Sequence, residues 1–440
     1  QEVRYGNAFM RFARAGLPII DDPVLSEYID DLGQRLLTNA DGVRFPFTFF
    51  LINDPSINAA AFLGGRVKVH TGLFLYADNE SELASVLAHE ITHVTQRHIA
   101  RYMEAQASSS AMTLAGLVGS IALAVINPTA GIAALQTTLG LSMQSAINYT
   151  RDNEYEADRI GMKTLYDAGF DPMGMASFFQ KLAAEYRYAS KPPEMLLTHP
   201  LPETRISEAR ARANSYGRRA LPPSLDFWLA KVRIQVRYGT ESPQALLTYF
   251  DSRLQKGDYP LKDAATYGKA LALLQLKRTD EADTLMQSLA ARHPEDLFVV
   301  DALTDIDLAK GRSAQAIARL ERFRTRMPDN EVVVVNLGNA YLEGGNYQKS
   351  IAILDPYARE HDENSLAWSL LSDAYRKAGR MTDLDMARAE TLSLRGDYQA
   401  AIDELIVARG TTSDKLTLAR IEARITQLER AKKDLDSLKG

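Results

Sequence analysis

Two histidines and a glutamate near residue 90 have the types and spacing needed for metal-dependent hydrolysis. The segment 87–93 reads Leu-Ala-His-Glu-Ile-Thr-His and contains the pattern HExxH within a largely apolar helical run. His89 and His93 are four residues apart, so both imidazoles leave the same face of a helix and can bind one ion. Glu90 can reach a water on that ion without binding the ion itself. The spacing therefore predicts a metal site with two histidine ligands and a carboxylate base.

A third ligand must come from elsewhere, because a catalytic zinc ion usually takes three protein ligands. A later helical stretch contains Glu154 and Asp158, which are four residues apart and share a face, whereas Glu156 points away from that face. Alone, this pattern is more often a solvated acidic face. Combined with the histidine pair, it predicts one Zn²⁺ per chain, with Glu154 as a ligand and Asp158 as the acceptor for the free N–H of a bound imidazole.

His98 follows the histidine pair but is expected to take no part in the site. It lies nine residues beyond His89. On one continuous helix this spacing turns the side chain about 180° away from the ligands. We therefore expect His98 to be a surface residue at the far end of the helix.

Length and composition limit the class of protein that holds these residues. A chain of 440 residues exceeds one ordinary core, so two domains are expected. A hydrophobic fraction of 46% and a charged fraction of 24% are typical of a globular protein. The net charge of −5 argues against nucleic acid as a principal partner. The absence of cysteine excludes a thiolate zinc site, a cysteine nucleophile and disulfides, and it fits a bacterial envelope protein.

A proline-bearing stretch at 218–224 separates two regions of different character, so we predict domains at 1–222 and 223–440. The second region is helical throughout and repetitive, with Pro294 and Pro328 one repeat of 34 residues apart. A period of 34 with small and aromatic residues resembles the tetratricopeptide repeat. The prediction is an α-solenoid with a C-terminal capping helix; a helical bundle without true repeats is the alternative.

The first region mixes helices with a few strands. Helical periodicity begins near residue 24, strand patterns occupy 47–52 and 66–70, and helices dominate from residue 79. The segment 58–62 is expected to be an exposed edge strand beside the cleft, where an extended substrate could add a strand. The fold class predicted for the chain is mostly α, with a small β-sheet in the first domain.

The first region resembles the zinc peptidases that include the CAAX prenyl protease and the HtpX-type quality-control proteases. The resemblance covers most of 47–210 and departs at Leu63, where many members have proline. With the repeats added, the whole chain resembles bacterial periplasmic proteases of β-barrel assembly. The matching motifs, in family order, are Asn58-Ala59 with Gly64-Gly65, Gly72-Leu73, His89-Glu90-x-x-His93, Glu154-x-x-x-Asp158, His199-Pro200 and Arg205-Ile206.

The resemblance implies a gluzincin-type metalloprotease domain with His89, His93 and Glu154 as ligands and Glu90 as the base. It also implies that His199 and Arg205 lie on a loop over the site and face the substrate or the metal. Either could donate to the oxyanion of the transition state. A second role for His199 stays open, because its proline-flanked loop could place the imidazole at the open zinc position and keep the enzyme inactive.

The resemblance further implies a zinc-dependent endopeptidase for quality control of outer-membrane β-barrel proteins. Its expected partners are unfolded or misassembled polypeptides and the β-barrel assembly machinery, recruited by the repeats in the periplasm. Two alternatives are a chaperone-like repeat scaffold with little or no proteolysis and a zinc hydrolase that acts on a non-peptide bond.

The segment 105–150 has no charged residue, but its most apolar part, 114–126, is only 13 residues long and too short to span a bilayer. We expect either an interfacial hairpin with peripheral membrane contact or a helical pair packed on the protease core.

Overall fold

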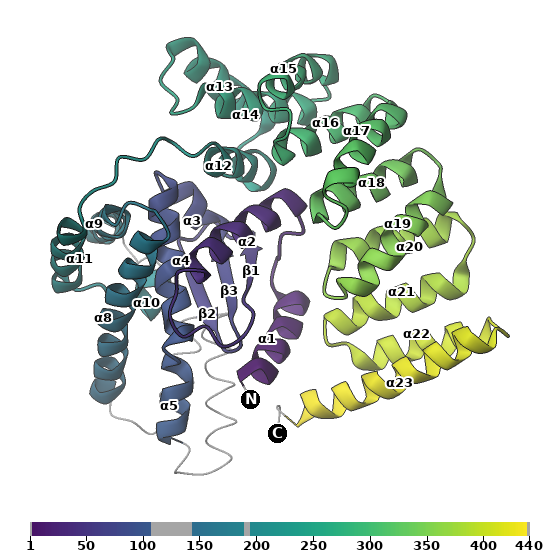
Figure 1. Cartoon of the computed structure of the whole chain (residues 1–440), viewed down its shortest axis with the longest axis horizontal. Helices are drawn as coiled ribbons and strands as arrows, with labels where there is room; N and C mark the ends of the chain where they lie inside the picture. Colours follow the sequence, from purple (N-terminus) through teal and green to yellow (C-terminus); the bar gives the residue numbers. More distant parts are fainter. Residues whose placement is uncertain (1, 107–142, 189–193, 438–440) are drawn as a thin grey trace. The chain divides into compact units, whose positions relative to one another are not determined.

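The computed structural model describes the backbone of residues 2–106, 143–188 and 194–437 (Figure 1). The chain divides into two compact units. One contains the residues up to 20 together with 28–239, and the other contains 21–27 and the chain from 240 onward. The predicted boundary at 222 and 223 lies just before helix α12 (Leu225–Tyr238), which packs against α3 (Thr71–Tyr76) of the first unit.

A three-stranded sheet forms one layer of the first unit, with β1 (Thr48–Ile52), β2 (Ala59–Phe62) and β3 (Arg66–His70) in the order β1-β3-β2. β1 runs parallel to β3, and β2 runs antiparallel to it. Gly64 and Gly65 make the turn between β2 and β3, each with φ 74°. A Cβ at Gly65 would lie 2.7 Å from the Pro46 carbonyl oxygen, so no other residue fits there without a shift.

Strand β2 lies at the sheet edge, but it is not exposed as the sequence led us to expect. Ala59, Ala61 and Phe62 are buried. The reason is that α4 (Glu80–Thr95) packs against this strand. The edge therefore faces the helix that carries the HExxH residues.

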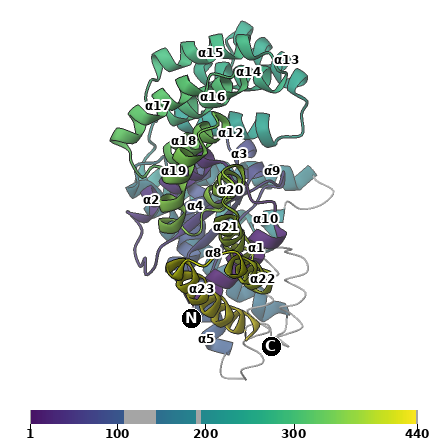
Figure 2. The ribbon, with the colours of Figure 1, turned by 90° about the vertical axis from the view of Figure 1, so that its right-hand side faces the viewer.

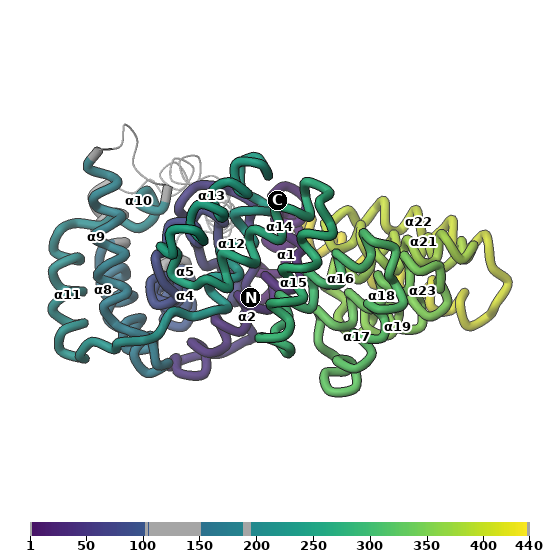
Figure 3. The backbone as a smooth tube through the Cα atoms, turned by 90° about the horizontal axis from the view of Figure 1, so that it is seen from above, coloured from purple at the N-terminus to yellow at the C-terminus, as the bar shows by residue number. Residues whose placement is uncertain are grey.

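Helix α4 is at the centre of the first unit and is buried along nearly its whole length. It begins at the N-cap Asn79, whose side chain accepts a hydrogen bond from the Glu82 amide. Helices α8 and α9 pack against α4, and α11 packs against both of them; Figure 3 shows α8, α9 and α11 next to one another. The other helices before the repeats are α1 (Glu2–Gly16), α2 (Pro23–Leu37), α5 (His98–Gln106), α8 (Met143–Asp167), α9 (Met173–Tyr188), α10 (Glu194–Thr198) and α11 (Glu203–Tyr216).

The predicted membrane-contacting segment, 105–150, falls largely outside the described residues. Only its two ends are seen, in α5 and at the start of α8. Among the helices that the structure describes, none combines the length and apolar character needed to cross a bilayer.

The second unit is a stack of antiparallel helix pairs, which Figure 2 shows following one another from α18 to α23. The second helices of successive pairs begin at 279, 313, 347, 381 and 415, so these five starts keep the period of 34. The predicted fold class, mostly α with a small β-sheet in the first domain and an α-solenoid in the second, is confirmed. The helices are α13 (Pro243–Lys256), α14 (Lys262–Gln275), α15 (Thr279–Arg292), α16 (Leu297–Ala309), α17 (Ser313–Arg326), α18 (Glu331–Glu343), α19 (Tyr347–Glu360), α20 (Ser365–Lys377), α21 (Met381–Leu394), α22 (Tyr398–Gly410) and α23 (Lys415–Asp436).

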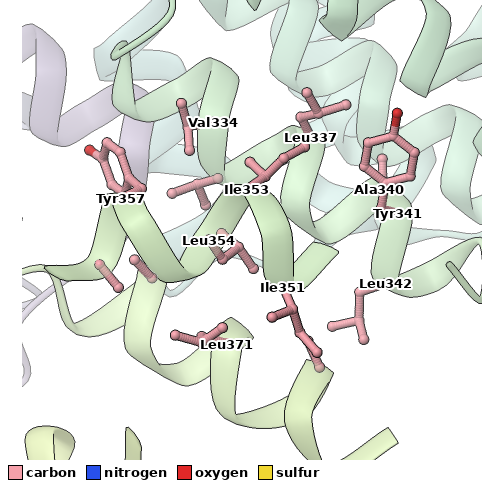
Figure 4. Close-up of a cluster of buried hydrophobic side chains, with 14 of the residues drawn as sticks. Val334, Leu337, Ala340, Tyr341, Leu342, Ile351, Ile353, Leu354, Tyr357 and Leu371 are labelled. Atoms are coloured by element: carbon pink, nitrogen blue, oxygen red, sulfur yellow. The ribbon is translucent and has the colours of Figure 1, made fainter. Parts of the chain in front are cut away.

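Neighbouring pairs share one apolar core. Figure 4 shows Ile351 and Leu354 of α19 between side chains of α18 and Leu371 of α20. A Cβ at Gly338 would lie 2.5 Å from Leu354 Cγ, so glycine is what lets α19 approach α18. The last helix, α23, buries one apolar face on α22, as a capping helix must.

In the second unit, called the repeat unit below, one turn between paired helices has a lysine where the equivalent turns have glycine. Lys277, between α14 and α15, has φ 62°, whereas the equivalent turns have Gly311, Gly345 and Gly379. A left-handed conformation costs an ordinary residue about 1–2 kcal/mol. We expect Lys277→Gly to raise the free energy of unfolding of the repeat unit by about that amount, measured by chemical denaturation of the full chain.

The matched control is Gly345→Lys, where an added Cβ would meet no atom within 4 Å. This variant should lose a similar free energy through the backbone alone. An unchanged unfolding midpoint for Lys277→Gly would contradict the assigned strain.

Candidate metal centre

Helices α4 and α8 bring the predicted ligands together. His89 Nε2 lies 3.0 Å from His93 Nε2 and 3.2 Å from Glu154 Oε2. His93 Nε2 lies 3.3 Å from Glu154 Oε1. The third side chain thus comes from α8, 61 positions after His93 in the sequence and adjacent to it in space. Together with His199, these residues offer ligand atoms that all lie within 4.8 Å of one another and could hold a metal ion.

Asp158 orients the first histidine. Its Oδ1 lies 3.0 Å from His89 Nδ1, and both side chains are buried. Because a carboxylate only accepts hydrogen bonds, Nδ1 carries a proton and donates it. Nε2 is then directed toward the other ligand atoms, as a metal-binding histidine requires.

Arg205 was expected on a loop facing the substrate, but it lies in α11 and is 2% exposed. Its Nε and Nη2 donate to Asp158 at 2.7 and 2.8 Å. Its Nη1 lies 2.9 Å from Glu154 Oε2 and donates to the Pro200 carbonyl at 2.6 Å. The guanidinium is therefore occupied with the two carboxylates. The loop position came from the family resemblance, whereas in the structure Pro202 is the N-cap of α11 and Arg205 lies in the first turn of that helix.

His199 follows the short helix α10 and enters the centre of the site. Its Nδ1 lies 3.1 and 3.2 Å from the two oxygens of Glu154 and 3.4 Å from His89 Nε2. Its Nε2 lies 3.4 Å from Glu90 Oε1. The imidazole thus lies between the carboxylate of Glu154, a predicted ligand, and that of Glu90, the predicted base.

Glu90 is buried and held by the edge strand. Its Oε2 accepts a hydrogen bond of 2.8 Å from the Ala61 amide of β2, and its Oε1 faces His199. The strand therefore fixes the direction of the carboxylate. Sequence spacing gave no sign of this contact, because it joins a backbone amide to a side chain 29 residues away.

His98 is buried rather than exposed, so its expected position at the surface is wrong. Its Nδ1 lies 2.8 Å from His93 Nδ1, and its Nε2 lies 3.0 Å from Glu156 Oε2. The error came from assuming one continuous helix. Helix α4 ends at Thr95, Arg97 takes φ 56°, and α5 starts at His98 in a new direction.

Burial and neighbouring charges shift the ionisation of these groups. Burial alone would raise the pKa of Glu154, but His199 and Arg205 hold it well below its usual range. Burial alone would lower the pKa of His89, but Glu154 and Asp158 raise it to about 10. Burial, with His93 beside it, lowers the pKa of His98 to about 3. Glu154 is therefore ionised, and its negative charge favours a positive charge beside it.

Comparison with known proteins agrees with this geometry. Residues 23–213 match peptidase family M48, and residues 264–296 and 307–374 match the tetratricopeptide repeat. The chain carries an M48 peptidase domain followed by tetratricopeptide repeats. Membership of this family implies a metal in the site.

Bacterial relatives align with both parts of the chain. The chain is 50% identical over 321 residues, or 73% of its length, to a beta-barrel assembly-enhancing protease of Yersinia pestis. It is 47% identical over 324 residues, or 74% of its length, to the protein of that name in Escherichia coli (strain K12). A Vibrio cholerae protein is 54% identical over 306 residues, or 70% of the chain. The chain spans 63–66% of the length of these relatives.

A glycine lets the two ligand helices of the M48 domain touch. Gly161 follows Glu154 by seven residues, which places both on the same face of α8. A Cβ at Gly161 would lie 3.1 Å from the Ala88 carbonyl oxygen and 3.2 Å from His89 Cα. A glycine inside a helix costs about 1 kcal/mol relative to alanine, so a glycine at this position is a sequence signal for close helix packing. This packing was not predicted from the sequence.

We expect Gly161→Ala to weaken metal binding by the M48 domain by roughly tenfold, the lower end of the range for residues that support metal ligands. The added methyl group pushes α8 from α4 and moves Glu154 away from the histidines. Competition with a chelator measures the affinity. Lys163→Ala, on the exposed face of α8, is the control. Equal affinity for Gly161→Ala and the unchanged chain would contradict the role assigned to this contact.

Proposed function

We propose that the chain is a zinc-dependent endopeptidase in which His89, His93 and Glu154 hold the ion and Glu90 is the catalytic base. The observation that carries the proposal is the convergence of two imidazole nitrogens and a carboxylate from two helices, with a second carboxylate beside them. HExxH and the M48 match support a peptidase, and the third ligand supports a catalytic rather than a structural metal.

The separations between the ligand atoms fit zinc. Four donors about 2.05 Å from a tetrahedral ion lie about 3.3 Å from one another. His89 Nε2 lies 3.0–3.4 Å from His93 Nε2, a Glu154 oxygen and His199 Nδ1, and Glu154 oxygens lie 3.1–3.3 Å from His199 Nδ1 and His93 Nε2. All four donors lie within 4.8 Å of one another. Nitrogen and oxygen donors are also the types that zinc accepts, and no thiolate competes with them.

The chain's own groups then have separate tasks. A zinc ion held by His89, His93 and Glu154 would lower the pKa of a water molecule toward neutrality and polarise a carbonyl group. Glu90 Oε1 accepts a proton from the attacking water and later returns it to the leaving amine, while Oε2 stays on the Ala61 amide. Asp158 holds the proton on His89 Nδ1. Arg205 aligns both carboxylates and is a positioning residue.

His199 has two candidate tasks, and its contacts favour one of them. With Nδ1 among the ligand atoms and Nε2 toward Glu90, the imidazole occupies the space that water and substrate need. We propose that His199 is a fourth ligand that inhibits the enzyme until α10 moves. Donation to the transition-state oxyanion is the other task.

The names of the relatives support a proposal for the substrates and the location. Two of them bear the name beta-barrel assembly-enhancing protease. We propose that the chain acts in the bacterial periplasm on unfolded or misassembled outer-membrane β-barrel proteins. It would be either a soluble protein there or one in peripheral contact with the membrane. The tetratricopeptide repeats would bind these clients or their assembly machinery, since stacked repeats present extended surfaces for proteins.

The first test compares the unchanged chain with Glu90→Gln on an unfolded polypeptide. We expect Glu90→Gln to lose cleavage by at least a hundredfold, because a general base contributes about 10²–10⁴-fold. Both proteins should contain one zinc per chain by elemental analysis, since Glu90 is not a ligand, and a chelator should abolish cleavage by the unchanged chain.

Cleavage that survives in Glu90→Gln would contradict the assignment of the base. If neither protein cleaves while both retain the polypeptide, and His199→Ala does not cleave it either, the chain is a repeat scaffold rather than an enzyme.

The second test replaces the inhibitory ligand. We expect His199→Ala to cleave the unfolded polypeptide several-fold faster than the unchanged chain, because the space beside Glu90 opens. Thr198→Ala, one residue earlier, is the control and should not change the rate. A collapse of cleavage in His199→Ala would show that the imidazole is a donor instead.

A further inference from the structure

We propose that His98 and Glu156 are positioning residues for the zinc ligand His93, holding the tautomer whose Nε2 is free to bind the ion. This inference rests on the zinc site proposed above. It assigns a function to a buried histidine and a carboxylate that lie outside the HExxH pattern and the third-ligand helix face.

The contacts form a continuous chain of polar groups behind His93. His98 Nδ1 lies 2.8 Å from His93 Nδ1, and His98 Nε2 lies 3.0 Å from Glu156 Oε2. Arg101 Nη2 donates to the same oxygen of Glu156 at 2.7 Å. His98 is 2% exposed, so its nitrogens must be satisfied within the protein.

These contacts fix where the protons lie. Glu156 is paired with Arg101, so it is ionised and can only accept; His98 Nε2 must therefore be the donor. In the neutral imidazole of His98, Nδ1 is then an acceptor. The hydrogen bond between the two Nδ1 atoms consequently takes its proton from His93, and His93 Nε2 is left with a free lone pair.

The pair mirrors the arrangement behind the other histidine ligand. There, His89 Nδ1 contacts Asp158, and Arg205 holds that carboxylate. Behind His93, the carboxylate is that of Glu156, and Arg101 holds it as Arg205 holds Asp158. The difference is that His98 lies between this carboxylate and His93. Both carboxylates come from α8, two residues apart. One helix thus orients both ligands of α4, by two of its faces.

The break between α4 and α5 places His98 beside His93, and it requires an unfavourable backbone conformation at Arg97. Arg97 adopts φ 56°, a conformation that costs an ordinary residue about 1–2 kcal/mol. Its guanidinium is held by Glu2 and Glu104. A continuous helix would have carried His98 away from His93. The bend is therefore what allows the imidazole to approach His93 Nδ1.

The test measures zinc affinity by chelator competition in the full chain. We expect His98→Ala and Glu156→Ala each to bind zinc 10–100-fold more weakly, the usual effect of removing a group that orients a ligand. His98→Gln should recover part of the affinity, because its side-chain oxygen can accept from His93 Nδ1. Asp152→Ala, an exposed acidic residue of the same helix, should bind like the unchanged chain.

A second measurement separates positioning from general stability. The thermal unfolding of each variant is recorded with zinc removed, and the visible spectrum is recorded after Co²⁺ is bound. We expect a changed Co²⁺ spectrum in His98→Ala that is restored toward the original in His98→Gln. Variants that unfold earlier but keep the zinc affinity and the Co²⁺ spectrum of the unchanged chain would overturn the inference.

Failure of the proposed function gives a different result. If the unchanged chain itself binds no zinc, the zinc site and this inference fall together. If the unchanged chain binds zinc and the His98 and Glu156 variants bind it equally well, only the inference is overturned.

Discussion

The M48 domain is built around one constraint: two imidazole nitrogens and a carboxylate must be held close together in the protein interior. The Nε2 atoms of His89 and His93 are 3.0 Å apart, and both face the ionised carboxylate of Glu154. Removing such groups from water is costly unless a positive charge offsets their negative charge and lone pairs. The raised pKa of His89 expresses the same demand. A bound cation satisfies it, so the site is shaped for a metal by its electrostatics as well as by its sequence motif.

Holding these atoms in place requires the rest of the M48 domain. Helix α4 is buried on all sides, which fixes its rotation, and Gly161 brings α8 into contact with it. Each histidine has a carboxylate behind it, directly for His89 and through His98 for His93. The edge strand holds the predicted base by a backbone amide. Rigid elements and satisfied hydrogen bonds are the general condition for a precise site.

Local periodicity made much of this site predictable, and long-range geometry set the limit. The spacing of His89 and His93 is a property of any helix, and a matching carboxylate pair pointed to Glu154. The position of His98 was missed because a single residue with positive φ redirects the chain. The helical setting of Arg205 was missed because the family resemblance implied a loop there, and the resemblance does not show that a helix begins at Glu203. The repeats were recognised because residues of the same type recur every 34 positions along the sequence, a spacing that the helices keep.

X-ray absorption at the zinc edge, on the full chain loaded with one equivalent of zinc, tests the central claim most directly. We predict a first shell of about four nitrogen and oxygen donors at about 2.0–2.1 Å. It should carry the multiple-scattering signal of two imidazoles, or three if His199 is bound. An ion surrounded by six oxygens, without an imidazole signal, would contradict the account.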